Sequence, residues 1–230
     1  MGKMGLGFIF AGCGGTFWTA TPILAALVKK YKPDLCAFVD PDILEAHNLQ
    51  RQWVNADAGQ SKVTVARFAV MGEAAEHGSI ASVNRFPEGG GQQFDGMDVI
   101  VITNVDSNAA RLDIRNWCRR RPGFSAMIVS GCDKTYGQVY TGIWHNQDAL
   151  VDWGEWHPEM ESPTSPANTC GQNIMSNAQT GVYLGWALMD VMEQYLGGGD
   201  AREYYWSRDQ GTSCLKGWME TIPMKVSVLR

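Results

Sequence analysis

Residues 7–40 read GFIFAGCGGTFWTATPILAALVKKYKPDLCAFVD, and this stretch decides the fold class. A short apolar run from Gly7 to Ala11 ends in glycines, and a helical pattern from Thr16 to Tyr31 follows it. Leu35 to Asp40 is a second apolar run that closes on an acid. Two apolar strands joined by a helix are typical of a βαβ unit, whose parallel strands are covered on both faces.

The same alternation continues to about residue 130. The pattern predicts further strands over 80–86, 98–103 and 126–130, and helices over 61–71 and 106–120. Beyond them it predicts an antiparallel strand over 136–145, a proline-rich crossover over 147–169, a long helix over 173–195, and a hairpin of 203–207 with 213–218. We therefore expect an α/β fold, with a Rossmann-like, mostly parallel sheet, helices on both faces, and antiparallel strands added in the C-terminal half.

Composition limits the classes of function. The 230 residues are 45% hydrophobic and 19% charged, which indicates a globular chain. The net charge of −5, without a basic run, argues against nucleic acid as a partner. No apolar run reaches the roughly 18 residues of a membrane span. The six cysteines form no Cys-x-x-Cys pair, so we expect neither a disulfide framework nor structural zinc, and a reduced, cytoplasmic protein is the default.

The glycine turn GCGGTF, Gly12 to Phe17, follows a strand and opens a helix. Gly12, Gly14 and Gly15 would let backbone amides approach a phosphate, and the helix N-terminus adds partial positive charge. Asp40, at the end of the next strand, can accept hydrogen bonds from ribose hydroxyls. These features indicate a nucleotide site but do not distinguish NAD from ATP. A glycine turn that only packs a helix on a sheet would show the same pattern.

Charged residues beyond other strands favour phosphoryl chemistry. Arg51 and Lys62 are cations that can hold a triphosphate, and Asp106 can hold Mg²⁺. They follow the carboxyl ends of predicted parallel strands, where open α/β sheets bind ligands. We expect Lys62 and Asp106 on the rim of the site. A hydride-transferring enzyme needs none of these three residues.

Four segments carry a resemblance to a known family: VDPDILEAHNLQRQ at 39–52, DAGQSK at 57–62, VDSNAARLDIRNWC at 105–118 and SGCDKTYGQV at 130–139. With the glycine turn they cover about residues 7–140, and they resemble the ThiF/MoeB superfamily, the adenylation domain shared with ubiquitin-activating enzymes. The most specific element is NLQRQ, residues 48–52. The resemblance implies a single adenylation domain over 1–230, with its nucleotide-binding half over about 1–130 and a flap and C-terminal half over about 131–230.

The resemblance also implies roles for individual residues. Asp40 would bind ribose, and Asp106 would hold the metal. The residues that would contact the ATP phosphates are Asn48, Arg51, Gln52 and Lys62, and those that would shape the site are Asn108 and Arg111. Cys170, before the long helix, stands where many members have a cysteine of the sulfur or thioester step; the alternative is a packing cysteine.

The sequence departs from the family at three places, of which the first is the absence of the zinc-binding Cys-x-x-Cys pairs that many members have. Phe17 replaces the last glycine of the turn, so we expect Phe17 and Trp18 to alter the rim of the pocket. The segment before the first strand is only about six residues long, where members often have a helix whose arginine reaches the partner subunit's ATP. These departures leave room for a specialised or reduced member.

The resemblance implies an ATP-dependent adenylyltransferase. A carboxylate, expected to be the C-terminal Gly of a small ubiquitin-like or sulfur-carrier protein, would attack the α-phosphate of ATP and release pyrophosphate. Because that carboxylate is already ionised, catalysis would be positioning plus charge neutralisation. A homodimer is expected, with the Trp-rich second half as an interface. Two alternatives stay open: a Rossmann NAD(P) oxidoreductase, and a nucleotide-binding partner subunit that has lost activity.

Overall fold

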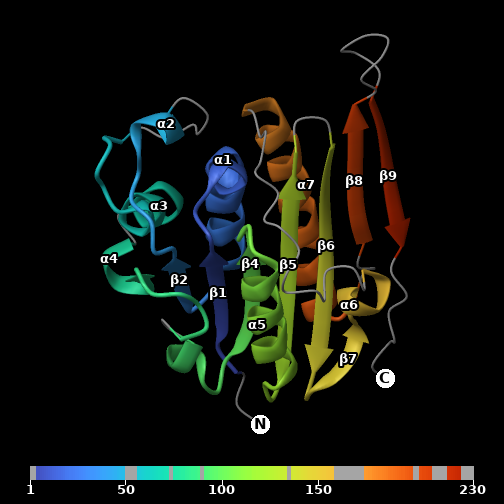
Figure 1. The fold of residues 1–230 in the computed structure, drawn as a ribbon. Helices are drawn as coiled ribbons and strands as arrows, with labels where there is room; N and C mark the ends of the chain where they lie inside the picture. Colours follow the sequence, from blue (N-terminus) through green and yellow to red (C-terminus); the bar gives the residue numbers. More distant parts are fainter. Residues whose placement is uncertain are drawn as a thin grey trace.

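A computed structural model describes residues 4–49, 56–72, 75–88, 91–133, 136–157, 174–198, 202–208 and 217–223. Its centre is one nine-stranded sheet in the order β3-β2-β1-β4-β5-β6-β8-β9, with β7 also paired to β6 (Figure 1). The five parallel strands are β1 (Leu6–Ala11), β2 (Leu35–Val39), β3 (Ser79–Ser82), β4 (Asp98–Thr103) and β5 (Phe124–Cys132). The antiparallel strands are β6 (Tyr136–His145), β7 (Asp148–Val151), β8 (Arg202–Arg208) and β9 (Gly217–Pro223).

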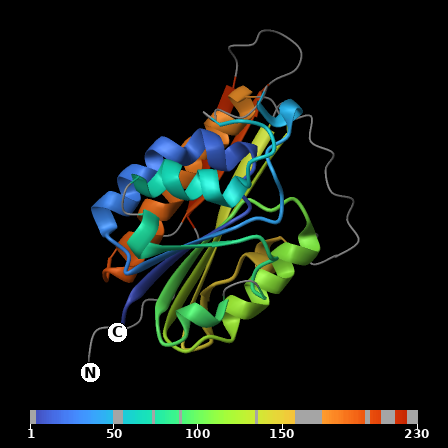
Figure 2. The ribbon, with the colours of Figure 1, turned by 90° about the vertical axis from the view of Figure 1, so that its left-hand side faces the viewer.

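Helices cover both faces of this sheet. Figure 2 shows α1 (Gly15–Tyr31), α3 (Lys62–Met71) and α7 (Ile174–Tyr195) on one face, and α5 (Asn108–Arg119) with α6 (Trp153–Trp156) on the other. The short elements α2 (Ala46–Leu49), α4 (Ala75–Gly78) and η2 (Gly91–Phe94) lie in the connections. The predicted fold class, a mostly parallel α/β sheet with antiparallel strands in the C-terminal half, is confirmed. Among the residues placed in the structure, no helix is both long and apolar enough to traverse a lipid bilayer.

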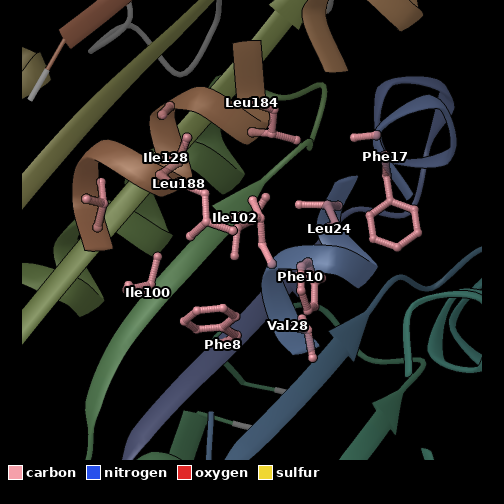
Figure 3. Close-up of a cluster of buried hydrophobic side chains, with 14 of the residues drawn as sticks. Phe8, Phe10, Phe17, Leu24, Val28, Ile100, Ile102, Ile128, Leu184 and Leu188 are labelled. Carbon is pink, nitrogen blue, oxygen red and sulfur yellow. The ribbon is translucent and has the colours of Figure 1, made fainter. Parts of the chain in front are cut away.

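The two faces of the sheet divide the core in two, because neighbouring residues of a strand point to opposite faces. Phe8 and Phe10 of β1 pack toward α1 and α7 together with alternate residues of β4 and β5 (Figure 3). Ile9 of β1 packs toward α5 and α6 with Val99 and Val101 of β4. The central strands are therefore apolar throughout, as expected for a parallel sheet with helices on both sides.

Three predicted elements differ from the structure by more than one or two residues at an end. The strand predicted over 80–86 ends at Ser82, because Phe86 leaves the sheet and packs edge-on against Trp117 of α5 with ring centroids 4.9 Å apart. The second strand of the predicted hairpin is β9, whose described residues are 217–223 rather than 213–218. The predicted crossover contains β7 and α6, and Asp152 caps α6 by accepting a hydrogen bond from the Gly154 amide at 3.1 Å.

Phe17 corrects another expectation. Its side chain is fully buried, and it meets Phe10 and Phe38 edge-on with ring centroids 6.0 and 6.4 Å apart. Trp18 is also buried, and its ring centroid lies 5.5 Å from that of Phe17. The expectation that these residues alter the rim of a pocket is therefore wrong: they belong to the core between α1 and the sheet.

We predict that Phe17→Ala costs about 3–5 kcal/mol of unfolding free energy, because it empties a packed aromatic site. Phe68→Ala is the control, since Phe68 lies on α3 with 45% of its surface exposed, and it should cost less than about 1 kcal/mol. Urea-induced unfolding measures both. Equal losses would contradict the core position of Phe17.

Candidate functional site

The glycine turn lies where the strand order reverses. β1 is flanked by β2 on one side and β4 on the other, and loops that follow β1 and β4 meet at the carboxyl ends of these strands. Gly12 has a φ of +86°, and its amide donates to the Val39 carbonyl at 2.8 Å. A Cβ on Gly12 would lie 2.8 Å from the backbone carbonyl carbon of Asn104. Gly12 therefore lets the two loops pass in contact at the switch point, the usual ligand position in such sheets.

The other two glycines have different surroundings. Gly14 is the N-cap of α1 and makes no side-chain capping hydrogen bond, and none of the residues placed in the structure has an atom within 4 Å of the position of a Cβ on it. A Cβ on Gly15 would lie 2.3 Å from the Nδ2 atom of Asn177. Gly15 thus makes room for a side chain of α7, and the turn opens outward at Gly14. The N–H groups of an uncapped helix N-terminus can bind an anion there.

Asp40 fixes the backbone of the glycine turn through hydrogen bonds. It is buried, its Oδ2 accepts a hydrogen bond from the Cys13 amide at 2.6 Å, and its Oδ1 accepts one from the Asp42 amide at 2.9 Å. Burial raises the pKa of the Asp40 carboxyl, while these two amides and the Lys62 ammonium oppose the rise. Both carboxylate oxygens therefore fix the backbone of two loops, a role beyond the predicted ribose contact.

Lys62 is the first residue of α3 and is buried, with 7% of its surface exposed. Its Nζ donates to Asp42 Oδ2 at 2.8 Å, and its amide donates to the Asp42 carbonyl at 3.1 Å. The expectation that Lys62 lies on the rim is wrong, because this ion pair and the packing of α3 draw it inward. Its charge still acts on the turn, since it opposes the rise in pKa that burial causes at Asp40 and Cys13.

The segment with the most specific motif is described only in part. Asn48 is buried in α2, where its Oδ1 accepts from the Glu45 amide at 3.1 Å and its Nδ2 lies 3.0 Å from His47 Nε2. These contacts organise the short helix itself. Arg51 and Gln52, the other predicted phosphate contacts, and Cys170 lie outside the described residues.

The loop after β4 presents Asp106 to solvent, as expected. Ser107 caps α5 by accepting from the Ala110 amide at 3.2 Å. Arg111 ties this loop to β5: its Nε donates to the Val105 carbonyl at 3.2 Å and its Nη2 to the Ser130 carbonyl at 3.3 Å. Its Nη1 lies 3.5 Å from Oδ1 of the buried Asn108. Arg111 and Asn108 therefore hold the backbone next to Asp106.

The oxygen donors near Asp106 show which kind of magnesium site this loop could form. Across the parts of the chain that the structure describes, no three His, Cys, Asp or Glu side chains group together to form a metal site. Mg²⁺ is usually held by one or two carboxylates together with substrate phosphates and water. A single exposed Asp106, on a loop that contacts the glycine turn, fits this mode.

Sequence reasoning missed two amide side chains beside the turn. Asn104 follows β4 directly, and its Oδ1 accepts from the Ser130 hydroxyl at 2.5 Å. Asn177, in α7, is fully buried against Gly15. Asn104 could have been found from its place after the apolar run DVIVIT. Asn177 has no comparable signal, because it lies within a helix far along the chain.

Known proteins share this architecture. The model of the ThiF family matches residues 35–207. Escherichia coli MccB, solved with MccA-N7isoASN, superposes with a TM-score of 0.61 and 15% identity, over 96% of this chain and 64% of MccB. MccB solved with ATP gives a TM-score of 0.61 and 14% identity over the same shares. PaaA gives a TM-score of 0.60 and 14% identity, over 93% of this chain and 72% of PaaA.

The structural matches and the family match support different conclusions. The chain spans 64% of the length of MccB, and no curated protein matches its sequence. At such low identity the superpositions show the fold. The family model is stronger evidence, because it covers most of the chain, including the loop after β2, the loop after β4 and the long helix α7. The chain belongs to the ThiF family.

Proposed function

We propose that this protein is an ATP-dependent adenylyltransferase that activates a carboxylate. The observation that carries the proposal is the uncapped N-terminus of α1, open at Gly14, at the switch point of a ThiF-family sheet. Lys62 lies on one side of it and the Asp106 loop on the other. The structures of MccB with ATP, and with AMPCPP and MccA, support a nucleotide and a polypeptide as ligands.

Each group in the site has a defined task under this proposal. The N–H groups of the first turn of α1 receive phosphate oxygens, and Lys62 and Arg51 supply positive charge. Asp106 holds Mg²⁺ together with those phosphates, and the ion neutralises phosphate charge. The substrate carboxylate attacks the α-phosphorus, and pyrophosphate leaves. Since charge builds on the phosphates during this step, fixed cations stabilise its transition state more than bound ATP.

Within the class of polypeptide carboxylates, we propose the C-terminal Gly of a small ubiquitin-like or sulfur-carrier protein as the substrate. Because MccB was solved with MccA, a peptide is the alternative substrate against which the carrier protein is compared. The oxidoreductase alternative rests on the glycine turn and Asp40 alone, and membership in the ThiF family disfavours it. The inactive-subunit alternative loses one of its two arguments, because Phe17 packs in the core.

We predict that Asp106→Ala lowers ATP–pyrophosphate exchange by on the order of 10²–10³, with the fold intact, because it removes one electrostatic group from the site. Asp113→Ala is the control: Asp113 is an exposed acid on the following helix, and its loss should leave exchange unchanged. Asp106 gives a cleaner test than Lys62, whose loss would also break a buried ion pair. Near-normal exchange in Asp106→Ala, in the presence of a carrier ending in Gly, would remove Asp106 from the mechanism.

We predict that Cys170 acts after adenylation. Its thiolate would attack the acyl carbon of the acyl adenylate, forming a thioester and releasing AMP. Cys170→Ser should therefore spare pyrophosphate exchange and abolish the covalent adduct with the carrier, as read by intact-protein mass spectrometry. Cys214→Ser serves as the control and should preserve both. Loss of exchange in a folded Cys170→Ser protein would show a different role.

We predict a homodimer that uses the outer side of α7. Met175, Val182 and Trp186 are exposed apolar residues at spacings of seven and four, so they share one side of the helix. Trp186 is 55% exposed, and aromatic side chains are enriched at interface cores. Light scattering should show a dimer for the parent protein and a monomer for Trp186→Glu. Val83→Glu, at an exposed position beyond β3, should remain dimeric. A dimeric Trp186→Glu would place the interface elsewhere.

A further inference from the structure

Three elements that are distant in sequence meet beside the glycine turn. They are the first turn of α1, the end of β5 and the first turns of α7. The Oδ1 atom of Asn177, in α7, accepts from the Thr16 hydroxyl of α1 at 3.4 Å and from the Cys132 thiol of β5 at 3.2 Å. Asn177 therefore joins α7 to both α1 and β5.

The other half of this amide is a donor without an acceptor. Asn177 has no exposed surface, and among the residues that the structure describes its Nδ2 has no hydrogen-bond partner. Nδ2 lies against Gly15, at 2.3 Å from where a Cβ would stand. A buried amide donor without an acceptor is costly and uncommon in folded proteins. Gly15 thus lets the Asn177 amide lie against the first turn of α1, and the Nδ2 donor held there lacks only an acceptor.

The groups around this place determine the chemistry of its ligand. The first turn of α1 offers backbone N–H groups without a side-chain cap, and Asn177 Nδ2 is another N–H donor. At the neighbouring Gly14, no atom of the described residues lies within 4 Å of where a Cβ would stand. These donors of α1 and α7 lie next to each other at Gly15, and a helix N-terminus favours a negatively charged acceptor.

We propose that Asn177 is a further ligand-binding residue of this site, whose Nδ2 donates to a phosphate oxygen of the nucleotide bound at the N-terminus of α1. The inference rests on the proposed function and adds a contact from α7 to it. It also links the nucleotide to the helix that begins directly after the segment with Cys170.

The test compares Asn177→Asp with the parent protein. Asp at this position keeps an oxygen for Thr16 and Cys132, but it replaces the donor with a negative acceptor. Isothermal titration calorimetry with ATP should show affinity weakened by about 10- to 100-fold, the scale of a hydrogen bond to a charged group. Adenosine, which has no phosphate, should bind equally well to both proteins. If Asn177→Asp does not fold, as judged by circular dichroism, Asn177→Ser replaces it and should weaken ATP about 10-fold.

Cys132→Ala is the matched control. It removes one donor to Asn177 Oδ1 and leaves Nδ2 in place, so ATP affinity should stay within about twofold of the parent. If the Cys132 variant weakens ATP as much as the Asn177 variant, or if adenosine is weakened as much as ATP, the role of Asn177 is packing and the inference fails. ATP affinity unchanged in the Asn177 variants also overturns it. A parent protein that binds no ATP would instead overturn the proposed function itself.

Discussion

The candidate site depends on one buried carboxylate. Asp40 accepts hydrogen bonds from the amide of Cys13 in the glycine turn and from the amide of Asp42 beyond β2. Asp42 in turn pairs with the ammonium of Lys62 at the start of α3. Because a buried carboxylate is tolerated only when its oxygens have partners, these contacts lock the turn, the β2 loop and α3 into one unit. The backbone of the candidate site is thus fixed by the protein's own contacts.

The three glycines of the turn have different roles in building the site. Gly12 allows contact with Asn104 after β4, and Gly15 allows contact with Asn177 of α7. Gly14, between them, has no described atom within 4 Å of the position of a Cβ. The loop is therefore contacted on both sides by neighbouring elements, with the N-terminus of α1 between them. A helix N-terminus fixed in this way suits an anion that must be positioned rather than chemically altered by a side chain.

Position along the sequence predicted which edge of the sheet a residue lies at, but not whether its side chain is buried or exposed. Lys62 and Asp106 both follow strand ends, yet Lys62 is buried in an ion pair and Asp106 is exposed. The difference arises from Asp42, which lies opposite Lys62 once the β2 loop has folded back. Phe17 shows the same limit, because a residue at a turn faces the core or the pocket according to the rotation of its helix. Asp40 was predicted as a ribose ligand, and its hydrogen bonds to the turn were not foreseen.

The sequence by itself determined the α/β class, the parallel direction of the strands in the first half and the family, because these follow from local signals. Apolar runs, helical periods and the motif NLQRQ are each read within a few residues. Only the tertiary structure decided which glycine opens outward and which side chains close around the turn. Asn177 meets Thr16 across 161 positions of the chain, and Cys132 meets Asn177 across 45. Such contacts exist only after α7 has packed on α1 and β5, and no local pattern encodes them.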